Sequence, residues 1–314
     1  MLMWQNGVKR KTLEYLICPS CLPEQSCLCP GNLCFGGEEI IEGCLACRRC
    51  GKTYPVCDGI ACLGKDGNEN LAASPYESPQ ALSTYLWTHY ADLFGDPEVT
   101  KAYCEWAEQI SPFSGTALDV GCATGRFSFE MSAKCDLVIG VDSSLSFVAT
   151  ARRIMEKRHL AFSVKEEGLI ESERQFTLPP GWNSAKVDFV VADAEALPFR
   201  SGSFGCVASL NVIDKTPHPL EHMNEVCRVA RPEKGQLLLS DPFSWSGRIC
   251  PPENWLGGTL VDRFAGAGID NVARLLAQAA PAWTISRRGA VWWKIRNHRN
   301  HFELIRSLFI KAQR

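Results

Sequence analysis

The fold is decided by residues 118–126, which read Leu118-Asp119-Val120-Gly121-Cys122-Ala123-Thr124-Gly125-Arg126. An apolar run that continues into small residues is typical of a buried strand, a tight turn and the start of a helix. Glycines in such a turn let the backbone approach a ligand, and the free N–H groups at the helix start favour an anionic group. Ala123 stands between the two glycines, so the Gly-x-Gly-x-x-Gly pattern of dinucleotide enzymes is absent and the dehydrogenase interpretation loses its best support.

The same alternation of strand and helix continues on the C-terminal side. Short apolar runs occupy residues 116–121, 137–142, 188–193, 206–211 and 236–241, with helical patterns at 127–134, 145–157 and 220–229. Continuous apolar runs suit strands that are buried on both faces. The pattern predicts an α/β fold with a doubly wound parallel sheet, whose ligands bind beyond the carboxyl ends of the strands. Residues 165–183 do not fit a simple helix and are expected to form an excursion before the third strand.

Two strand-end acids strengthen this interpretation. Asp142 closes the second apolar run and could accept hydrogen bonds from both hydroxyls of a ribose. Asp193 closes the third run and could accept from an adenine amino group, with the Ala194 N–H available to a ring nitrogen. Strand-end acids are also common as turn or cap residues. Their order on successive strands favours the ligand-binding role.

These motifs, together with residues 225–235, resemble those of class I S-adenosylmethionine-dependent methyltransferases over about residues 84–242. The resemblance implies a Rossmann-like methyltransferase fold in which the glycine turn faces the methionine part of the cofactor, Asp142 the ribose and Asp193 the adenine. Asn211 would lie near the reacting methyl group. The family most often has glycine where this chain has Ala123. The candidate cofactor-binding residues are Tyr90, Asp119, Gly121, Cys122, Ala123, Gly125, Asp142, Ser143, Asp193, Ala194 and Asn211, although for Tyr90, as for Tyr85, core packing is an equal alternative.

The second half of the chain should supply the pocket of the methyl acceptor. Methyl transfer from a sulfonium needs an aligned nucleophile, exclusion of water and, for some nucleophiles, a base. The candidate catalytic residues are Asn211, Asp214 and Asp241. His218 and His222 are also near enough in sequence to contribute, but a solvated helix face explains them as well. Aromatic walls suit a small ring or a cation, so the candidate substrate-binding residues are His218, Trp245 and Trp255.

The loop with Trp245 and Trp255 also looks like the corresponding part of the methyltransferase domain of ovothiol-forming enzymes, which N-methylate a thiol-bearing histidine. That similarity extends from about Asp119 into the C-terminal region. Residues 287–314 hold eight basic residues and one acid, Glu303, so a nucleic-acid surface is conceivable. The alternation of apolar and polar residues there favours an antiparallel pair of edge strands instead.

Ten of the sixteen cysteines fall between Cys18 and Cys62. Two pairs with two-residue gaps suit a tetrahedral zinc, so the candidate metal ligands are Cys18, Cys21, Cys47 and Cys50. Cys44 could replace one of them, and other cysteines could bind a second metal or none. Residues 11–63 resemble the small zinc-binding activator subunits that partner methyltransferases acting on transfer RNA and translation factors. The chain would then carry such a module fused to its enzyme.

The polar stretch after the cysteines reads as a linker. The predicted domains are a zinc-binding domain at 1–65, a linker at 66–83 and an S-adenosylmethionine-dependent methyltransferase domain at 84–314. With 33 basic and 35 acidic residues, the chain has no global field for a polyanion. Its apolar runs are shorter than the roughly 20 residues of a membrane span, and no signal peptide is recognised, so a cytoplasmic protein is expected.

Three functional hypotheses remain open. The leading one is an enzyme that uses S-adenosylmethionine and a structural Zn²⁺ and methylates a nitrogen or sulfur atom of a small molecule, such as an imidazole or thiol compound. The second is methylation of RNA or of a protein presented by the zinc module. The third is a non-catalytic zinc-binding interaction protein, which the intact cofactor motifs disfavour. A soft-metal or metalloid acceptor is a further variant, and the oligomeric state is not predicted.

Overall fold

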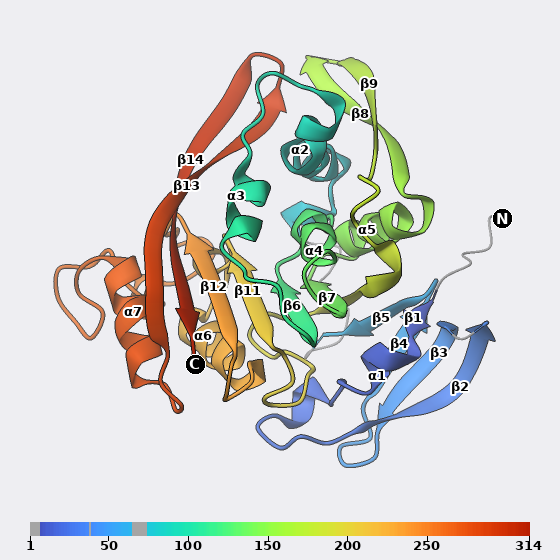
Figure 1. Cartoon of the computed structure of the whole chain (residues 1–314), viewed down its shortest axis with the longest axis vertical. Coiled ribbons are helices and arrows are strands. Elements are labelled where there is room, and N and C mark those ends of the chain that lie inside the picture. Colours follow the sequence, from blue (N-terminus) through green and yellow to red (C-terminus); the bar gives the residue numbers. More distant parts are fainter. Residues whose placement is uncertain (1–6, 38, 65–73) are drawn as a thin grey trace.

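The computed structural model describes residues 7–37, 39–64 and 74–314. In this part of the chain, twelve strands form one mixed sheet in the order β1-β3-β4-β5-β10-β7-β6-β11-β12-β14-β13, with β2 paired to β3 (Figure 1). The central strands are β6 (Thr116–Val120), β7 (Leu137–Asp142), β10 (Val187–Ala192), β11 (Cys206–Leu210) and β12 (Gln236–Asp241). They run parallel and are almost entirely buried, as their continuous apolar sequences require.

The order of the strands reverses between β6 and β11. From β6 the chain moves outward to β7 and β10 on one side, and then returns to β11 and β12 on the other side. Helices connect or flank these strands: α3 (Ala102–Glu108), α4 (Arg126–Met131), α5 (Leu145–Lys157) and α6 (Pro219–Val229). The predicted doubly wound fold is confirmed, with element ends within a few residues of those expected. A crevice at such a reversal is where ligands bind in open α/β sheets.

The C-terminal residues form two long antiparallel strands, β13 (Thr284–His298) and β14 (His301–Gln313), preceded by α7 (Gly268–Gln278). β14 pairs antiparallel with β12, and β13 lies at the edge of the sheet. The predicted antiparallel pair is therefore confirmed. The expected excursion is a hairpin of β8 (His159–Glu167) and β9 (Ile170–Thr177), which forms a separate two-stranded sheet beside α2 (Pro79–Tyr90). Short 3-10 turns complete these regions: η4 (Ala91–Phe94), η5 (Ser184–Lys186), η6 (Ile213–Lys215) and η7 (Pro252–Asn254).

The N-terminal region continues the same sheet. Its elements are β1 (Val8–Lys9), α1 (Arg10–Leu13), η1 (Pro19–Cys21), β2 (Leu28–Gly36), β3 (Glu39–Cys47), β4 (Thr53–Cys57) and β5 (Ile60–Leu63). β5 pairs in parallel with β10, through Cys62 opposite Val191 and Leu63 opposite Ala192. The prediction of domains at 1–65 and 84–314 did not include this pairing, because the sequence of a short strand does not indicate which strand it pairs with.

A buried ion pair joins the N-terminal region to the central sheet. Arg152 Nη1 of α5 lies 2.6 Å from Asp188 Oδ1 of β10, and both side chains are at most 1% exposed. Asp188 Oδ2 also accepts hydrogen bonds from the Lys9 N–H and the Thr12 hydroxyl, and Arg152 donates to the carbonyl of Gly7. Burial of these charges is tolerated because each has several hydrogen-bonding partners.

The predicted linker is only partly outside the described residues. Residues 66–73 of it are not described, whereas η3 (Pro75–Glu77) and the first turn of α2 occupy its second half. Glu77 accepts hydrogen bonds from the N–H groups of Leu145 and Ser146, and these bonds connect η3 to the start of α5. Pro and Ser in residues 74–83 thus begin helices, with Ser78 as the N-cap of α2, and the domain and linker boundaries stay a prediction.

Candidate active site

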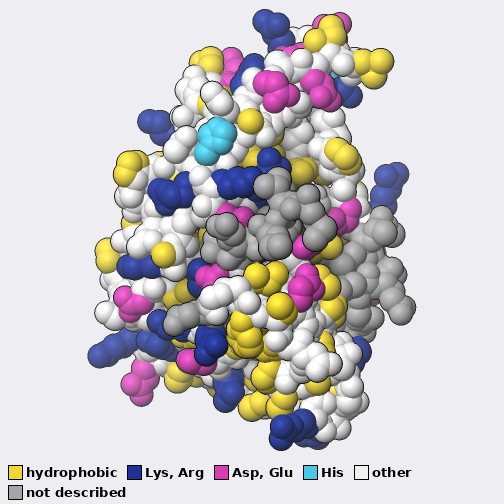
Figure 2. Space-filling view, turned by 90° about the vertical axis from the view of Figure 1, so that its right-hand side faces the viewer, with side chains coloured by type: hydrophobic (Ala, Val, Ile, Leu, Met, Phe, Trp, Pro, Cys, Tyr) yellow, Lys and Arg dark blue, Asp and Glu magenta, His cyan; other side chains and the backbone are white. Residues whose placement is uncertain are grey.

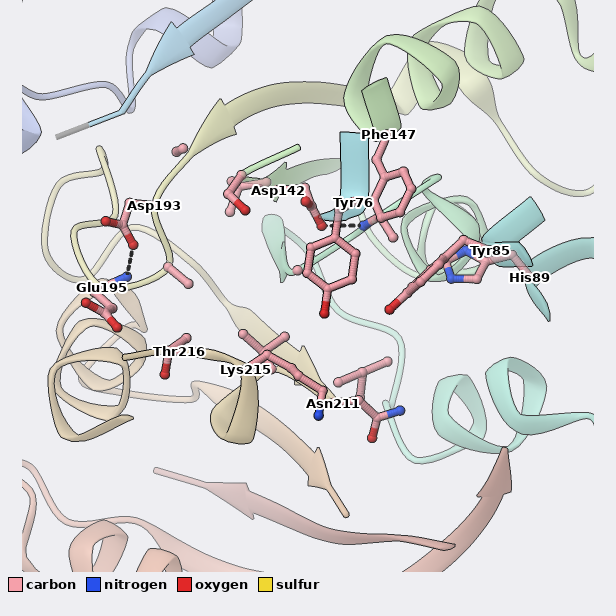
Figure 3. Close-up of a pocket in the computed structure, with 18 of the residues that line it drawn as sticks. Tyr76, Tyr85, His89, Asp142, Phe147, Asp193, Glu195, Asn211, Lys215 and Thr216 are labelled. Carbon is pink, nitrogen blue, oxygen red and sulfur yellow. Dashed lines mark hydrogen bonds between the residues drawn. The ribbon is translucent and has the colours of Figure 1, made fainter. Parts of the chain in front are cut away.

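A pocket of about 330 Å³ opens at the carboxyl ends of β6, β7, β10 and β11, where the strand order reverses (Figure 3). Seven of the predicted cofactor residues line it: Gly121, Ala123, Asp142, Ser143, Asp193, Ala194 and Asn211. The other lining residues are Tyr76, Tyr85, His89, Tyr103, Val141, Phe147, Ala192, Glu195, Leu210, Val212, Lys215, Thr216, Pro217 and Trp293. The pocket therefore combines a polar floor of strand-end turns with a largely aromatic wall.

The glycine turn needs its glycines for steric reasons. Gly121 has φ +73°, and a Cβ there would lie 2.3 Å from Cγ2 of Val212. Gly125 has φ +86°, and its Cβ would lie 2.6 Å from the ring of Phe189. Ala123, at φ +44°, shows that the intervening position accepts a methyl group at the cost of a left-handed conformation. The departure from the usual glycine leaves the turn intact.

Asp142 is held at the end of β7 by two backbone amides. Its Oδ2 accepts from the Ala123 N–H at 2.9 Å, and its Oδ1 accepts from the Ser144 N–H at 2.9 Å. Burial raises the pKa of this carboxyl to about 6, although the two amide hydrogen bonds work against the rise. Asp142 is therefore mostly ionised at neutral pH and can accept hydrogen bonds from a ligand in the pocket.

The Asp193 turn is anchored from both sides. Asp193 Oδ1 accepts from the Glu195 N–H at 2.8 Å. On the side facing α6, His222 Nδ1 donates to the Ala194 carbonyl at 3.1 Å, and its Nε2 accepts from the Ser209 hydroxyl at 2.9 Å. Burial lowers the pKa of His222 to about 4, so this histidine is neutral and serves to hold the turn.

Asn211 carries the clearest sign of a ligand site. Its φ of +60° is unusual for a residue other than glycine, and its N–H donates to the Ser240 carbonyl. Its Oδ1 atom is buried and has no hydrogen-bond partner in the described part of the chain. A buried polar atom without a partner is costly, so a ligand that donates to Asn211 Oδ1 would be favoured.

The aromatic wall was only partly foreseen. Tyr85 packs against Phe147, with ring centroids 4.8 Å apart, and against Trp293 and Tyr76, at 6.3 and 6.0 Å. Tyr76 lies in the stretch interpreted as a linker, and Trp293 comes from edge strand β13. An aromatic residue in an otherwise polar Pro/Ser stretch is the only sequence signal that could have pointed to Tyr76, and nothing local marked Trp293.

His89 is a buried residue at the side of the pocket, and its ring joins two hydroxyl groups by hydrogen bonds. Its Nε2 lies 2.6 Å from the Tyr103 hydroxyl and its Nδ1 lies 3.0 Å from the Thr124 hydroxyl. Burial, with a smaller contribution from the charge of Arg126, lowers the pKa of His89 to about 3. A neutral imidazole at this position fixes the Tyr103 hydroxyl and does not act as a base near neutral pH.

Four of the predicted cofactor residues lie behind the pocket surface. The Asp119 carboxylate accepts from the Ser128 hydroxyl at 2.6 Å, and burial raises its pKa to about 7. The Tyr90 hydroxyl donates to the Thr124 carbonyl at 2.7 Å, and its ring stacks on Phe176. Cys122 and Gly125 are part of the turn. These four residues support the turn, and none of them lines the pocket.

The predicted acceptor residues also lie outside the pocket lining, apart from Asn211. Trp245 and Trp255 stack on each other at 5.9 Å, and Trp255 Nε1 donates to the Cys250 carbonyl. His218 is exposed and pairs with Glu195, with Nδ1 2.9 Å from Oε2. The substrate-binding roles of these three residues stay predictions.

Asp214 and Asp241 form a buried carboxyl pair, at most 1% exposed. The Asp214 N–H donates to Asp241 Oδ2, and the Ser244 N–H donates to Asp214 Oδ2. Burial and the charge of Asp214 raise the pKa of Asp241 well above its usual range. Neither residue lines the pocket, but the neighbouring Lys215 does, and its Nζ lies 3.0 Å from Asp214 Oδ1.

The four predicted metal ligands come together. The Sγ atoms of Cys18, Cys21, Cys47 and Cys50 all lie within 4.8 Å of one another, and the Cys18–Cys50 and Cys21–Cys47 distances are both 3.7 Å. Gly51, directly after the last of them, has φ +75°. Cys44 instead faces the Gly31 carbonyl, and no second group of metal-ligand type is found within residues 7–37, 39–64 and 74–314.

A parallel α/β sheet with an acidic residue and a glycine turn at its reversal point is typical of proteins that bind nucleotide cofactors. Comparison with known families gives the class: residues 118–239 match the family model described as a methyltransferase domain. The chain therefore contains a class I S-adenosylmethionine-dependent methyltransferase domain.

Two uncharacterised methyltransferases of Arabidopsis thaliana, both described as chloroplastic, are similar to this chain. One is 24% identical over 74% of this chain and 63% of its own length, and the other is 26% identical over 70% and 58%. The chain thus spans about six tenths of the length of these relatives. A solved methyltransferase from Aquifex aeolicus aligns with 75% of this chain and 98% of its own, at 14% identity and a TM-score of 0.44. In the described ranges, no helix has the length and apolar character needed to cross a membrane.

Proposed function

We propose that this protein transfers a methyl group from S-adenosylmethionine to a nitrogen or sulfur atom of a small molecule. The observation that carries the proposal is the unpaired, buried Oδ1 of Asn211 in a pocket that also presents Asp142 and Asp193. One face of the pocket offers acceptors for the hydroxyl and amino groups of a nucleoside. The other face offers apolar surface and a free acceptor at which a nucleophile can be oriented.

The residues present fit the cofactor. Asp142 would accept from the ribose hydroxyls, the Asp193 turn would hold the adenine, and the turn from Gly121 to Gly125 would approach the methionine part. When bound, S-adenosylmethionine supplies an electrophilic methyl group. The chain would contribute alignment and partial exclusion of water, because Tyr76, Tyr85 and Trp293 line the pocket.

Asn211 would orient the acceptor. An N–H or S–H group that donates to Asn211 Oδ1 has its position fixed, and a pocket of about 330 Å³ with an aromatic wall accommodates a small molecule better than a polymer. Among the basic C-terminal residues, Arg296 gives the RNA alternative little support, since it is 6% exposed and pairs with Glu166 at 2.8 Å, whereas Arg299 and Arg306 are exposed. Figure 2 shows a different face, the right-hand side of the view in Figure 1, where basic side chains are interspersed with acidic and apolar ones.

A structural Zn²⁺ at the four cysteines is part of the proposal. Thiolates at about 2.3 Å from a tetrahedral zinc are roughly 3.8 Å apart, which agrees with the two 3.7 Å sulfur–sulfur distances. With all four positions filled by protein, such an ion has no open site for a substrate. Elemental analysis of the purified protein should find one zinc per chain, and a fully folded, metal-free protein would contradict this part.

Methyl-labelled S-adenosylmethionine tests the catalytic proposal. The protein is incubated with the labelled cofactor and, separately, with the small-molecule, RNA and protein fractions of a cell extract, at low and high salt. We expect label in the small-molecule fraction with little dependence on salt. Label in RNA that falls steeply with salt would replace the proposed acceptor class. Absence of S-adenosylhomocysteine binding in calorimetry would overturn the cofactor assignment itself.

A further inference from the structure

Lys215 is the one cationic side chain among the described residues that line the pocket. It ends η6, four residues after Asn211, and its side chain is 35% exposed. Figure 3 shows Lys215 and Asn211 on the same side of the pocket, opposite Tyr76 and Asp142. Tyr76 and Lys215 line the same pocket; burial raises the pKa of the Tyr76 hydroxyl, and the positive charge of Lys215 opposes that rise.

The buried carboxyl pair holds Lys215 in place. Its Nζ lies 3.0 Å from Asp214 Oδ1, and Asp214 in turn is fixed by its contacts to Asp241 and Ser244. The contact is an ion pair without hydrogen-bond geometry, since Asp214 Oδ1 has no hydrogen-bond donor in the described part of the chain. The ammonium group carries three hydrogens, so it keeps donors available for a ligand.

The acidic residues of the pocket already have donors. Asp142 accepts from two amides and Asp193 from one, while both Glu195 oxygens face His218, at its N–H and its Nδ1. Among the described charged side chains that line the pocket, these three carboxylates would repel an anionic group, and Lys215, although paired with Asp214 behind it, would attract one. The pocket is therefore electrostatically asymmetric: the carboxylates make one part negative, and Lys215 makes another part positive.

We propose that Lys215 is a specificity-determining residue that selects a methyl acceptor with a carboxylate or phosphate group on a flat apolar body. The flat body would pack on the aromatic wall formed by Tyr76, Tyr85, Phe147 and Trp293, while the anionic group would pair with the ammonium. This assignment rests on the proposed function, because it takes the remaining pocket surface to belong to the cofactor.

The test uses three simple probes that share a flat ring. Benzoate, its neutral isostere benzamide, and phenyl phosphate are titrated into protein saturated with S-adenosylhomocysteine, with binding followed by ligand-observed NMR. We expect benzoate to bind at least about tenfold more tightly than benzamide, the contribution of one charge-assisted contact. Tighter binding of phenyl phosphate than of benzoate would identify the anion as a phosphate. Equal binding of benzoate and benzamide would overturn the proposal without any variant.

Variants then assign the preference to Lys215. Lys215→Met should abolish the preference for benzoate and Lys215→Arg should retain it, whereas Lys157→Met, an exposed lysine at the end of α5 outside the pocket, should behave like the original protein. Circular dichroism checks that each variant is folded. A preference that persists in folded Lys215→Met would overturn the proposal.

A last arm separates the acceptor from the cofactor, whose methionine part also carries a carboxylate. Affinities of S-adenosylhomocysteine and of 5′-methylthioadenosine, which lacks that carboxylate, are compared in Lys215→Met. We expect both affinities to stay within about twofold of the original protein. A loss confined to S-adenosylhomocysteine would assign Lys215 to the cofactor and overturn the proposal, whereas failure of the original protein to bind either ligand would overturn the proposed function instead.

Discussion

The cofactor pocket and the cysteine cluster both place their functional groups on short turns, but different forces hold those turns. The turns with Asp142 and Asp193 follow buried parallel strands, so hydrogen bonds and apolar packing fix them in the protein alone. Cys18 and Cys21 lie on a 3-10 turn, and Cys47 and Cys50 lie at a tight turn after β3. We infer that the pocket is preformed, whereas the geometry of the cluster would depend on the proposed zinc.

The largest effect is expected at the cluster. Cys18→Ser or Cys47→Ser should lower zinc content and the midpoint of thermal unfolding together, because binding of a structural zinc is coupled to the folding of its turns and contributes on the order of 10 kcal/mol in small modules. Elemental analysis and calorimetry measure both quantities. Cys34→Ser, an exposed cysteine of the same region outside the cluster, is the matched control. An unchanged melting temperature in Cys18→Ser would contradict the inference that the cluster, unlike the pocket, depends on a metal for its structure.

The next effect concerns the ion pair that joins the regions. Asp188→Asn leaves the guanidinium of Arg152 buried without its counter-charge, which should lower the free energy of unfolding by about 3–5 kcal/mol. Urea titration measures it. Asp270→Asn removes an exposed pair with Arg288 and should cost at most about 1 kcal/mol. Similar values for the two variants would mean that the connection between the regions contributes little.

A change within the preformed pocket should affect binding more than folding. Asp142→Ala should weaken S-adenosylhomocysteine affinity by about ten- to a hundredfold or more, because hydrogen bonds to a charged group contribute about 1.5–3 kcal/mol each. Calorimetry measures the affinity and circular dichroism the fold. Unchanged affinity in a folded variant would remove the ribose assignment.

The smallest effect is a pH dependence. Since Asp142 has a pKa of about 6 in the free protein, its ligand-accepting form is lost below that value, and S-adenosylhomocysteine affinity should fall roughly tenfold between pH 7.5 and pH 5. For folding, the sign is opposite: a carboxyl with a raised pKa contributes most to stability at low pH, and this contribution is lost as the pH rises through about 6. In Asp142→Asn, the binding profile should flatten. A profile that is unchanged in this variant would assign the titration to another group.

Much of the cofactor site could be predicted because its residues lie at strand ends. Gly121, Asp142, Asp193 and Asn211 follow successive apolar runs, and parallel strands bring such residues to one edge of the sheet. The wall of the pocket could not be predicted in this way. Tyr76 and Trp293 are 217 positions apart, and only the packing of η3 and β13 against α2 and α5 brings them to the same pocket.

The amino-acid sequence by itself determined the doubly wound sheet, the turn at residues 121–125 and the two cysteine pairs with two-residue gaps, because each is recognised from local patterns: short apolar runs, small residues in a turn, or the spacing within a pair. Only the tertiary structure decided that β5 extends the central sheet through β10, that Trp245 and Trp255 stack outside the pocket, and that Lys215 lies in its positive part. Those outcomes depend on which surfaces meet after the sheet has formed. The pairing of short strands and the burial of aromatic side chains depend on contacts between residues far apart in the sequence. Local sequence patterns therefore do not indicate which strand or side chain will be the partner.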